Sequence, residues 1–411
     1  RIQPKHALRI QGFPPNFQLP NSRTEAMKQL GNSVAVDAVK ACAEELIKHL
    51  KVIDIRNVKG EEMARTRNKG EWTELYTFLK LIVDKKIEFS DEKLNPTKEY
   101  LKVSKISTLN INEEVYLDNG TVKIKKRNIK KAIDENLINS KQLLDIKKEI
   151  VGGKATFEIE QAEKIFEKMG INIINGGTST QKADIILDVK YNQTLHENEG
   201  FGIKSYLGVK PTLLNASGSN TNFVFEVRNF KDEYIDEVNN IQTRTKISDR
   251  INKIYSYGGY LDFKNVEAET MHYNLKVLDD KMPNLLASLI LNYYKNRQSN
   301  LMKNLKETFD NEEIGLPFSL DYDAYIIKIK RFLIAILLGM FSGKKWDGKF
   351  TLNGTIVVKN DGCQVVFHII KLNILENFIF ENIKFDTPSS TRHRFASLYK
   401  ERDGKFYIKL N

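Results

Sequence analysis

Cysteine is scarce in this sequence, and its scarcity excludes two classes of protein. Only two of the 411 residues are cysteine, Cys42 and Cys363, and they lie far apart. Such a pair forms neither a disulfide-stabilised scaffold nor a zinc-ligand motif. We expect a protein of the reducing cytoplasm.

Long hydrophobic segments are lacking as well. The longest apolar run, Phe332 to Phe341, is too short to span a bilayer, and it predicts a buried helix. No signal peptide is visible, so we expect no membrane or secretory segment. Because the chain starts at Arg1 instead of Met, we expect it to be a fragment of something longer.

Acidic residues are outnumbered by basic ones. Lys and Arg total 64 against 53 Asp and Glu, which gives a net charge of +11. This excess favours a polyanionic partner, because Lys and Arg make most contacts to phosphate groups. A generic basic surface without a nucleic-acid partner is the alternative at this point. Hydrophobic residues make up 41% of the chain, enough for a sizeable core.

Composition divides the chain into three segments. Residues 1–52 begin with a proline-punctuated stretch, and two helices are predicted after it, one from Ser22 and one from Val34 to about Leu50. Residues 53–69 are polar and charged, which is typical of an exposed linker. Residues 70–411 form the remainder, where we expect one large domain.

Residues 156–228 carry the clearest pattern of elements. A helix is predicted at Glu160–Met169, followed by a strand at Ile171–Ile174 and then three longer strands. The longer strands run from Asp184 to Val189, from Phe201 to Tyr206 and from Phe223 to Val227. A helix and strands joined by short links are typical of an α/β core. We therefore expect an α/β (α+β) fold with a mixed central sheet flanked by helices.

The rest of the large segment predicts further helices and strands. Trp72, Leu75, Leu79 and Ile82 have the spacing of an amphipathic helix. Residues 101–128 alternate apolar and polar as strands do, whereas residues 129–150 resemble a helix and residues 190–199 a turn-rich loop. Helices are expected at 283–308 and 323–341, and strands over 350–411.

Asp184 and Lys204 form the constellation with the clearest chemical meaning. Asp184 begins one predicted strand, and Lys204 lies in the next strand, twenty residues later. Phosphodiester hydrolysis needs a carboxylate to hold Mg²⁺ and a positive group to stabilise developing charge. Adjacent strands can hold both groups rigidly at one edge. The bland alternative is a surface aspartate that caps a turn and a solvated lysine.

This arrangement resembles the PD-(D/E)XK nuclease core. In that core an aspartate opens one strand, and an acidic residue, any residue and a lysine follow on the next. Here the second element reads Gly202-Ile203-Lys204, so glycine replaces the expected acid. The departure puts the second carboxylate in doubt.

A longer series of motifs resembles the HpaII-type restriction endonucleases, over about residues 68–411. The motifs are Gly70-Glu71-Trp72-Thr73-Glu74, Lys182-Ala183-Asp184-Ile185, Gly200 to Gly208, Thr212 to Gly218, Thr221-Asn222-Phe223, Lys246 to Ile251, Asp386-Thr387-Pro388-Ser389 with Arg392-His393, and Tyr407 to Asn411.

The resemblance implies a type II restriction endonuclease that cleaves double-stranded DNA at the palindrome CCGG with Mg²⁺, opposed to a cognate methyltransferase. It implies that Asp184 is a metal ligand and Lys204 the catalytic lysine, and the carbonyl of Ile203 is a further candidate ligand. Cleavage of both strands of a palindrome indicates a homodimer on DNA.

A second carboxylate is needed, because a single one holds Mg²⁺ weakly. Glu163, on the helix before the core strands, is the first candidate for this metal-binding and catalytic role. Glu158 and Glu226 are alternatives. Asp188 is a poor candidate, because four residues along one strand separate it from Asp184 by about 13 Å. For Glu163 a solvated helix position is the competing interpretation.

Base and phosphate contacts are expected from polar residues near the catalytic strand and from one basic pair. Amide, hydroxyl and guanidinium groups can read base edges in the major groove. An ordinary turn is the alternative for the Asn and Ser residues, and a phosphate contact for the arginine. The candidate DNA-binding residues are Ser205, Asn215, Ser217, Asn220, Asn222, Arg392 and His393.

Residues 1–52 resemble a different family. Arg9-Ile10-Gln11-Gly12-Phe13-Pro14 and Gln29-Leu30-Gly31-Asn32-Ser33-Val34 are similar to the last two motifs of the cytosine-5 DNA methyltransferases. The Pro-Cys nucleophile motif and the glycine-rich cofactor loop are absent, and about fifty residues are too few to build the cofactor-binding sheet. We expect the C-terminal tail of a methyltransferase, whose upstream portion lies in the same polypeptide or in a separate chain.

Two other functions are compatible with these patterns. The glycine at position 202 would suit a DNA-binding module that has lost nuclease activity. The N-terminal tail would suit part of a bifunctional methyltransferase-endonuclease. Cleavage of plasmid DNA with Mg²⁺ distinguishes the first from a nuclease, and binding of S-adenosylmethionine tests the second.

Overall fold

The computed structural model divides the chain into two compact units, Arg1–Thr66 and Arg67–Asn411. The division lies inside the segment predicted as a linker. The first unit contains helices α1 (Pro4–Ile10) and α2 (Arg23–Gly31), and the helix predicted from Val34 lies almost wholly outside the described residues. The structure describes residues 3–10, 13, 17–19, 22–31, 44, 66–108, 113–118, 121–126, 129–133, 137–171, 173, 183–208, 211, 213–214, 221–311, 316–317, 319–387 and 395–411.

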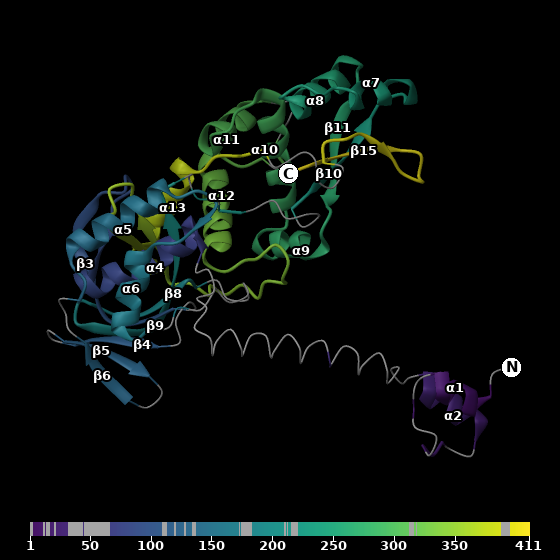
Figure 1. The fold of residues 1–411 in the computed structure, drawn as a ribbon. Helices are drawn as coiled ribbons and strands as arrows, with labels where there is room; N and C mark the ends of the chain where they lie inside the picture. The colour runs from purple at the N-terminus through teal and green to yellow at the C-terminus, as the bar shows by residue number, and fades with distance from the viewer. Residues whose placement is uncertain are drawn as a thin grey trace. The chain divides into compact units, whose positions relative to one another are not determined.

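The second unit is built on a nine-stranded mixed sheet, as predicted from the sequence (Figure 1). Its strand order is β2-β13-β12-β9-β8-β3-β4-β5-β6, and β2 pairs with β3 as well. The β9–β12 and β13–β2 pairs are parallel and the remaining pairs are antiparallel. The strands are β2 (Lys86–Ser90), β3 (Pro96–Thr108), β4 (Glu114–Asp118), β5 (Thr121–Lys126), β6 (Ile129–Ile133), β8 (Ile185–Tyr191), β9 (Thr194–Ser205), β12 (Gly354–Val358) and β13 (Gln364–His368).

One face of this sheet is covered by α4 (Lys69–Asp84), α5 (Ser140–Gly152) and α6 (Glu160–Met169). The apolar spacing predicted for α4 is confirmed, because Trp72, Leu75, Leu79 and Ile82 are all buried. Asn68 accepts hydrogen bonds from the first backbone amides of α4, and Glu71 completes a capping box. The sequence therefore fixes both the start of α4 and the side that it buries.

The opposite face packs against a second apolar core that includes α12 (Tyr322–Leu338) and α13 (Leu372–Asn382). Successive strand residues point to opposite faces. Phe201 and Ile203 therefore contact the core of α4 to α6, whereas Lys204 and its neighbour Val357 in β12 face the other core. This alternation places Ile203 and Lys204 on opposite faces of β9.

A second, four-stranded sheet has the order β11-β10-β15-β14. Its strands are β10 (Phe223–Arg228), β11 (Tyr260–Val266), β14 (Tyr399–Lys400) and β15 (Phe406–Leu410). Helices of the same region are α7 (Ile235–Asn239), α8 (Lys246–Ser256), α9 (Glu269–Leu278), α10 (Met282–Asn296) and α11 (Leu301–Asp310) (Figure 1). The strand predicted at Phe223–Val227 is confirmed, but it lies in this four-stranded sheet and not beside β8 and β9, where we expected it.

Three local predictions were wrong. Residues 129–133 form strand β6 instead of a helix, because their register with β5 lets them extend the sheet edge, and the helix begins only at Ser140. Residues 190–199 belong mostly to the β8–β9 hairpin, whose turn is only Asn192-Gln193, both with positive φ. The predicted helix at 283–308 is two helices, because Arg297 adopts a left-handed conformation that ends α10.

The apolar run near residue 335 forms the buried second half of α12, as predicted. In the part of the chain that the structure describes, no helix has the length and apolar character needed to cross a membrane. A short two-stranded sheet, β1 (Arg67–Asn68) with β7 (Thr156–Phe157), completes the unit.

Candidate active site

Asp184 and Lys204 lie side by side where β8 begins. Ile185 pairs with Phe201, so Asp184 stands just before β8 and opposite Gly202. The backbone amide of Ile203 donates a 2.7 Å hydrogen bond to Asp184 Oδ2. Strand β9 continues past the start of β8 to Ser205. The two predicted residues therefore share one edge.

Burial changes the proton affinity of both groups in opposite directions. It raises the pKa of Asp184, and the hydrogen bond from Ile203 and the charge of Lys204 partly oppose this. Burial lowers the pKa of Lys204, and the charge of Asp184 partly opposes it. Both shifts follow from desolvation of the charged form. A carboxylate and an amine placed in a half-buried setting are typical of sites with catalytic roles.

The carbonyl of Ile203 points to the same side as Asp184. The N–H and C=O of one strand residue point in the same direction. The Ile203 amide faces the Asp184 carboxylate, and the Phe201 carbonyl accepts a 3.0 Å hydrogen bond from the Asp184 amide. The Ile203 carbonyl thus faces the space beyond the start of β8, where it can serve as an oxygen ligand.

Gly202 stands between Asp184 and β12, and a side chain there would meet its neighbours. A Cβ atom at this position would lie 3.3 Å from Leu352 Cδ1 and 3.9 Å from Asp184 Oδ2. Leu352, which is 4% exposed, thus occupies the space of the acid that the nuclease motif normally carries. The sequence shows that position 202 lacks an acid, but it does not show that Leu352 packs against this position.

A cavity of about 100 Å³ extends from Lys204 along the face that carries α12 and α13. Its lining is mainly apolar and includes Leu337, Val357 and Phe378, with Thr355 among the few polar residues. Thr355 was not predicted, because only the β9–β12 register, which joins residues 153 positions apart, brings it beside Gly202. No local pattern in the sequence signals this contact.

Glu163 is engaged elsewhere. Its carboxylate forms a 2.5 Å ion pair with Arg67, whose guanidinium lies over the ring of Trp72. The helix that carries it, α6, packs on the sheet face opposite to Lys204. The structure therefore does not bring Glu163 together with Asp184 and Lys204, and its role as the second metal ligand stays a prediction.

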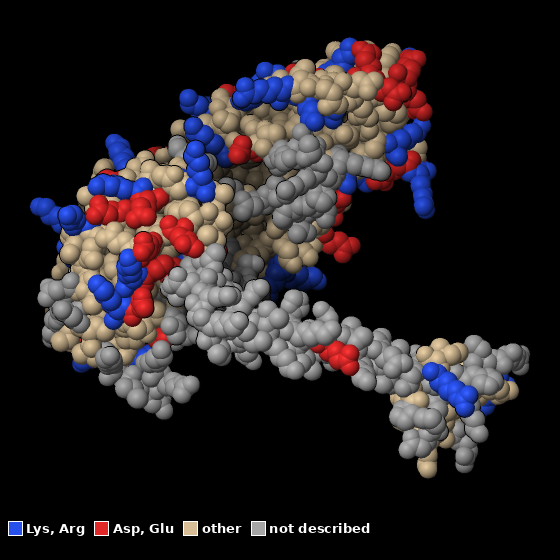
Figure 2. All heavy atoms as spheres, in the orientation of Figure 1, with Lys and Arg blue, Asp and Glu red and all other residues tan. Residues whose placement is uncertain are grey.

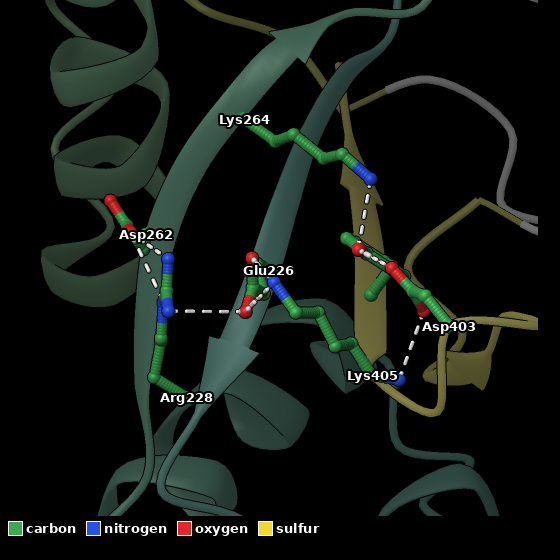
Figure 3. Close-up of polar contacts among 7 residues, drawn as sticks. Glu226, Arg228, Asp262, Lys264, Asp403 and Lys405 are labelled. Carbon is green, nitrogen blue, oxygen red and sulfur yellow. Dashed lines mark hydrogen bonds and ion pairs between the residues drawn. The ribbon is translucent and has the colours of Figure 1, made fainter.

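Glu226, an alternative to Glu163, lies in the other sheet. Figure 3 shows it between Arg228 and Lys405, with its carboxylate at 3.3 Å and 3.2 Å from their nitrogens. Because β10 belongs to the four-stranded sheet, Glu226 is part of a separate ion network. Glu158 is exposed, and Asp188 lies 3.5 Å from Lys105 Nζ, so neither joins Asp184.

Two of the predicted DNA-binding residues have partners inside the protein. The Ser205 hydroxyl lies 3.0 Å from that of Thr73 on α4, on the face opposite to Lys204. Asn222 is 2% exposed, donates to Glu267 and accepts from Asn411. The sequence did not predict these contacts within the protein, and the role of both side chains in DNA binding stays a prediction. The remaining candidates, Asn215, Ser217, Asn220, Arg392 and His393, lie outside the described residues.

Surface charge on the face drawn in Figure 2 is mixed. Lys and Arg side chains lie there among Asp and Glu. On this face charge alone does not mark a binding site, so we identified the site from its geometry.

The donor set at this edge fits a hard cation. Among the described residues no group of three or more Asp, Glu, His or Cys could hold a metal ion. Mg²⁺ tolerates such a sparse set, because it is bound by one or two carboxylates together with waters and substrate phosphates. Asp184 and the Ile203 carbonyl supply hard oxygens, and the substrate would complete the set.

Comparison with known proteins identifies both parts of the chain. The family model "HpaII restriction endonuclease" matches residues 68–411, and "C-5 cytosine-specific DNA methylase" matches residues 1–48. The type II restriction enzyme HpaII of Haemophilus parainfluenzae is 32% identical over 353 residues, which cover 84% of this chain and 96% of the relative. No solved structure matches.

The N-terminal matches are short. The type II methyltransferase M.SsoII of Shigella sonnei is 52% identical over 50 residues, and M.HpaII of Haemophilus parainfluenzae is 40% identical over 50 residues. Each match covers 12% of this chain and only 13% and 14% of the respective relative. The N-terminal residues are thus similar to only a small part of a methyltransferase.

Proposed function

Because the chain belongs to the HpaII restriction endonuclease family and is a type II site-specific deoxyribonuclease, we propose that Asp184 and Lys204 form its catalytic site. The observation that carries this proposal is the shared edge of β8 and β9, where the Ile203 amide holds the Asp184 carboxylate beside Lys204. We propose CCGG as the site cut, with Mg²⁺ as cofactor, and a homodimer on DNA.

Asp184 and the Ile203 carbonyl would hold the cation in this mechanism. When bound, Mg²⁺ supplies positive charge to the scissile phosphate and lowers the pKa of an attacking water. The Ile203 amide fixes one oxygen of Asp184, so the carboxylate is oriented before DNA arrives. Preorganisation of this kind avoids a cost of rearrangement in the transition state.

Lys204 acts on the phosphate and the water. Lys204 lines the largely apolar cavity beside Asp184. There its charge or its hydrogen bonds stabilise the negative charge that develops on the phosphate oxygens. The role needs a long side chain on the same face as Asp184, which the antiparallel register provides.

The N-terminal tail would serve an upstream methyltransferase portion, in the same polypeptide or in a separate chain. A methyltransferase of the same specificity would protect host DNA from the nuclease. The short coverage of the methyltransferase relatives supports a role for residues 1–48 as a completing segment, without methylation by this chain.

Substitution at the two catalytic positions tests the site. Asp184→Ala and Lys204→Ala should each lower Mg²⁺-dependent cleavage of plasmid DNA by more than about 1,000-fold, because each removes a charge that acts in the transition state. DNA binding, measured by gel shift with Ca²⁺, should be largely retained. Lys190→Ala, an exposed lysine on the same hairpin, is the matched control and should cleave normally.

Sequencing the ends of the digested DNA tests the specificity in the same experiment. Fragments that all end within CCGG, and disappear when the site is methylated, are the expected result. Ends at another sequence would contradict CCGG alone, whereas normal cleavage by both alanine variants would contradict the catalytic assignment.

A further inference from the structure

Thr355 continues the row of residues that begins with Asp184 and Gly202. Asp184 lies opposite Gly202 across β8 and β9, and Gly202 is in register with Thr355 across β9 and β12. Residues at matching positions of neighbouring strands point to the same face of a sheet. Asp184 and Thr355 therefore flank Gly202, which has no side chain, on the face that carries Lys204.

The hydroxyl of Thr355 is not explained by the fold. Thr355 is 3% exposed, and within the described residues its Oγ1 atom has no hydrogen-bond partner. Its neighbours in β12 are the apolar Ile356, Val357 and Val358. Valine would fill nearly the same volume without burying a polar atom, so packing alone does not require a threonine.

Lys204 lies within reach of this hydroxyl. Lys204 is in register with Val357, two residues beyond Thr355, and diagonal neighbours across a strand pair are within reach of long side chains. Lys204 and Thr355 also line the same cavity. Lys204 also interacts electrostatically with Asp184, which belongs to the same row as Thr355.

We propose that Thr355 is a positioning residue for the reaction: its Oγ1 accepts a hydrogen bond from Lys204 Nζ and holds the amine between the Thr355 hydroxyl and the Asp184 carboxylate. The inference rests on the proposed catalytic role of Lys204. A lysine has three N–H donors and a flexible stem, so a fixed acceptor limits its orientations. With glycine at 202, the motif lacks the acid that would otherwise share this task.

Two substitutions separate the hydroxyl from its packing. In the full chain, Thr355→Val should lower kcat for cleavage of a CCGG duplex with Mg²⁺ by roughly 10- to 100-fold, because the amine loses its orientation. KM and the Kd for DNA should not change. Thr355→Ser keeps a hydroxyl and should keep most of the activity. The Tm of Thr355→Val should equal or exceed that of the wild type, because a buried unpaired hydroxyl is removed.

Thr308→Val is the matched control. Thr308 is also fully buried, but its hydroxyl donates a 2.8 Å hydrogen bond to the Asn304 carbonyl in α11. Its valine variant should therefore have a lower Tm and an unchanged kcat. The opposite pattern in Thr355→Val distinguishes a role in the reaction from a role in stability.

Three results would overturn the inference. Wild-type kcat in Thr355→Val would show that the hydroxyl does not orient Lys204. If Thr355→Val and Thr355→Ser lost kcat to the same extent, and both had a lower Tm than the wild type, Thr355 would have a packing role. Normal cleavage by Lys204→Ala would contradict the proposed catalytic role of Lys204, and the inference with it. The first two results would leave that catalytic role intact.

Discussion

Gly202 is the residue at which this site departs most clearly from the nuclease motif. The motif places an acid there, but Leu352 packs where that side chain would begin. Among the described residues, the proposed site therefore has the carboxylate of Asp184, the carbonyl of Ile203 and the amine of Lys204. At the scale of single residues, a glycine and a leucine decide that no acid stands at position 202.

Substitution of Gly202 tests this packing. Gly202→Ala should lower the free energy of unfolding by about 1 kcal/mol, because the new Cβ would lie 3.3 Å from Leu352 Cδ1 in a buried setting. Urea unfolding measures the change. Gly152→Ala is the control, because a Cβ there meets nothing within 4 Å, and its stability should change by less than about 0.5 kcal/mol. Equal stability of the two variants would argue against close packing at Gly202.

Strands β9, β12 and β13 are held together at the opposite end of the site by His368. His368, Gly354 and Phe201 are in register, and the His368 ring lies 5.7 Å from that of Phe201. Its Nε2 atom is 2.9 Å from Glu199 Oε2. Gly354 lacks a side chain between the two rings, where a Cβ would come within 3.1 Å of Phe201. The contact fixes β9 against β12 on the face opposite to Lys204.

The buried His368 predicts a pH dependence of stability. Burial lowers the pKa of His368, and Glu199 opposes this while His196 adds to it. The unfolded chain, with a histidine pKa of about 6.5, then binds more protons than the folded one just below that pH. Stability should therefore fall as the pH drops from about 6.5 through the lower folded pKa.

Thermal unfolding between about pH 5 and pH 8 measures this dependence. His368→Gln has no proton to take up at this position, so its Tm should fall less steeply over the same interval. Identical slopes for the variant and the wild type would show that His368 does not contribute to the pH dependence.

The whole molecule consists of two compact units, and the two family models match different parts of the chain. The nuclease unit Arg67–Asn411 contains both sheets and both apolar cores, and it corresponds to the HpaII-family match. Residues 1–48 match the C-5 cytosine-specific DNA methylase family, and the 50-residue match to M.SsoII covers 13% of that relative. Nothing in the cores of the nuclease unit draws on the N-terminal residues, as described in the structure.

A shortened chain tests the independence of the nuclease unit. A protein of residues 67–411 should fold, bind DNA and cleave at the rate of the full chain, because it keeps every residue of both apolar cores. A chain that begins at Thr77 is the control, because it loses the buried Trp72, Leu75 and Tyr76 and should not fold. Loss of cleavage in the 67–411 chain would contradict this division.

Calorimetry of the full chain should detect no binding of S-adenosylmethionine.

Local sequence determined much of what the structure contains. Apolar spacing set the buried side of α4, and alternation set strands β8 and the end of β9. Since these patterns depend on neighbours within a few residues, they can be read without a fold. The proximity of Asp184 and Lys204 could be predicted from the sequence, because β8 and β9 follow each other in the chain and form one hairpin.

Tertiary structure decided which residues surround that pair. Thr355 reaches the site through the parallel β9–β12 register, and Leu352, two residues before β12, packs against Gly202. Both are about 150 residues away in sequence, and no period in the sequence encodes such a pairing. The same long-range packing placed Glu163 against Arg67, Ser205 against Thr73 and Asn222 against Glu267, contacts that the sequence did not predict. Residue chemistry was visible in the sequence, but the face of the sheet that each residue occupies depended on strand pairing.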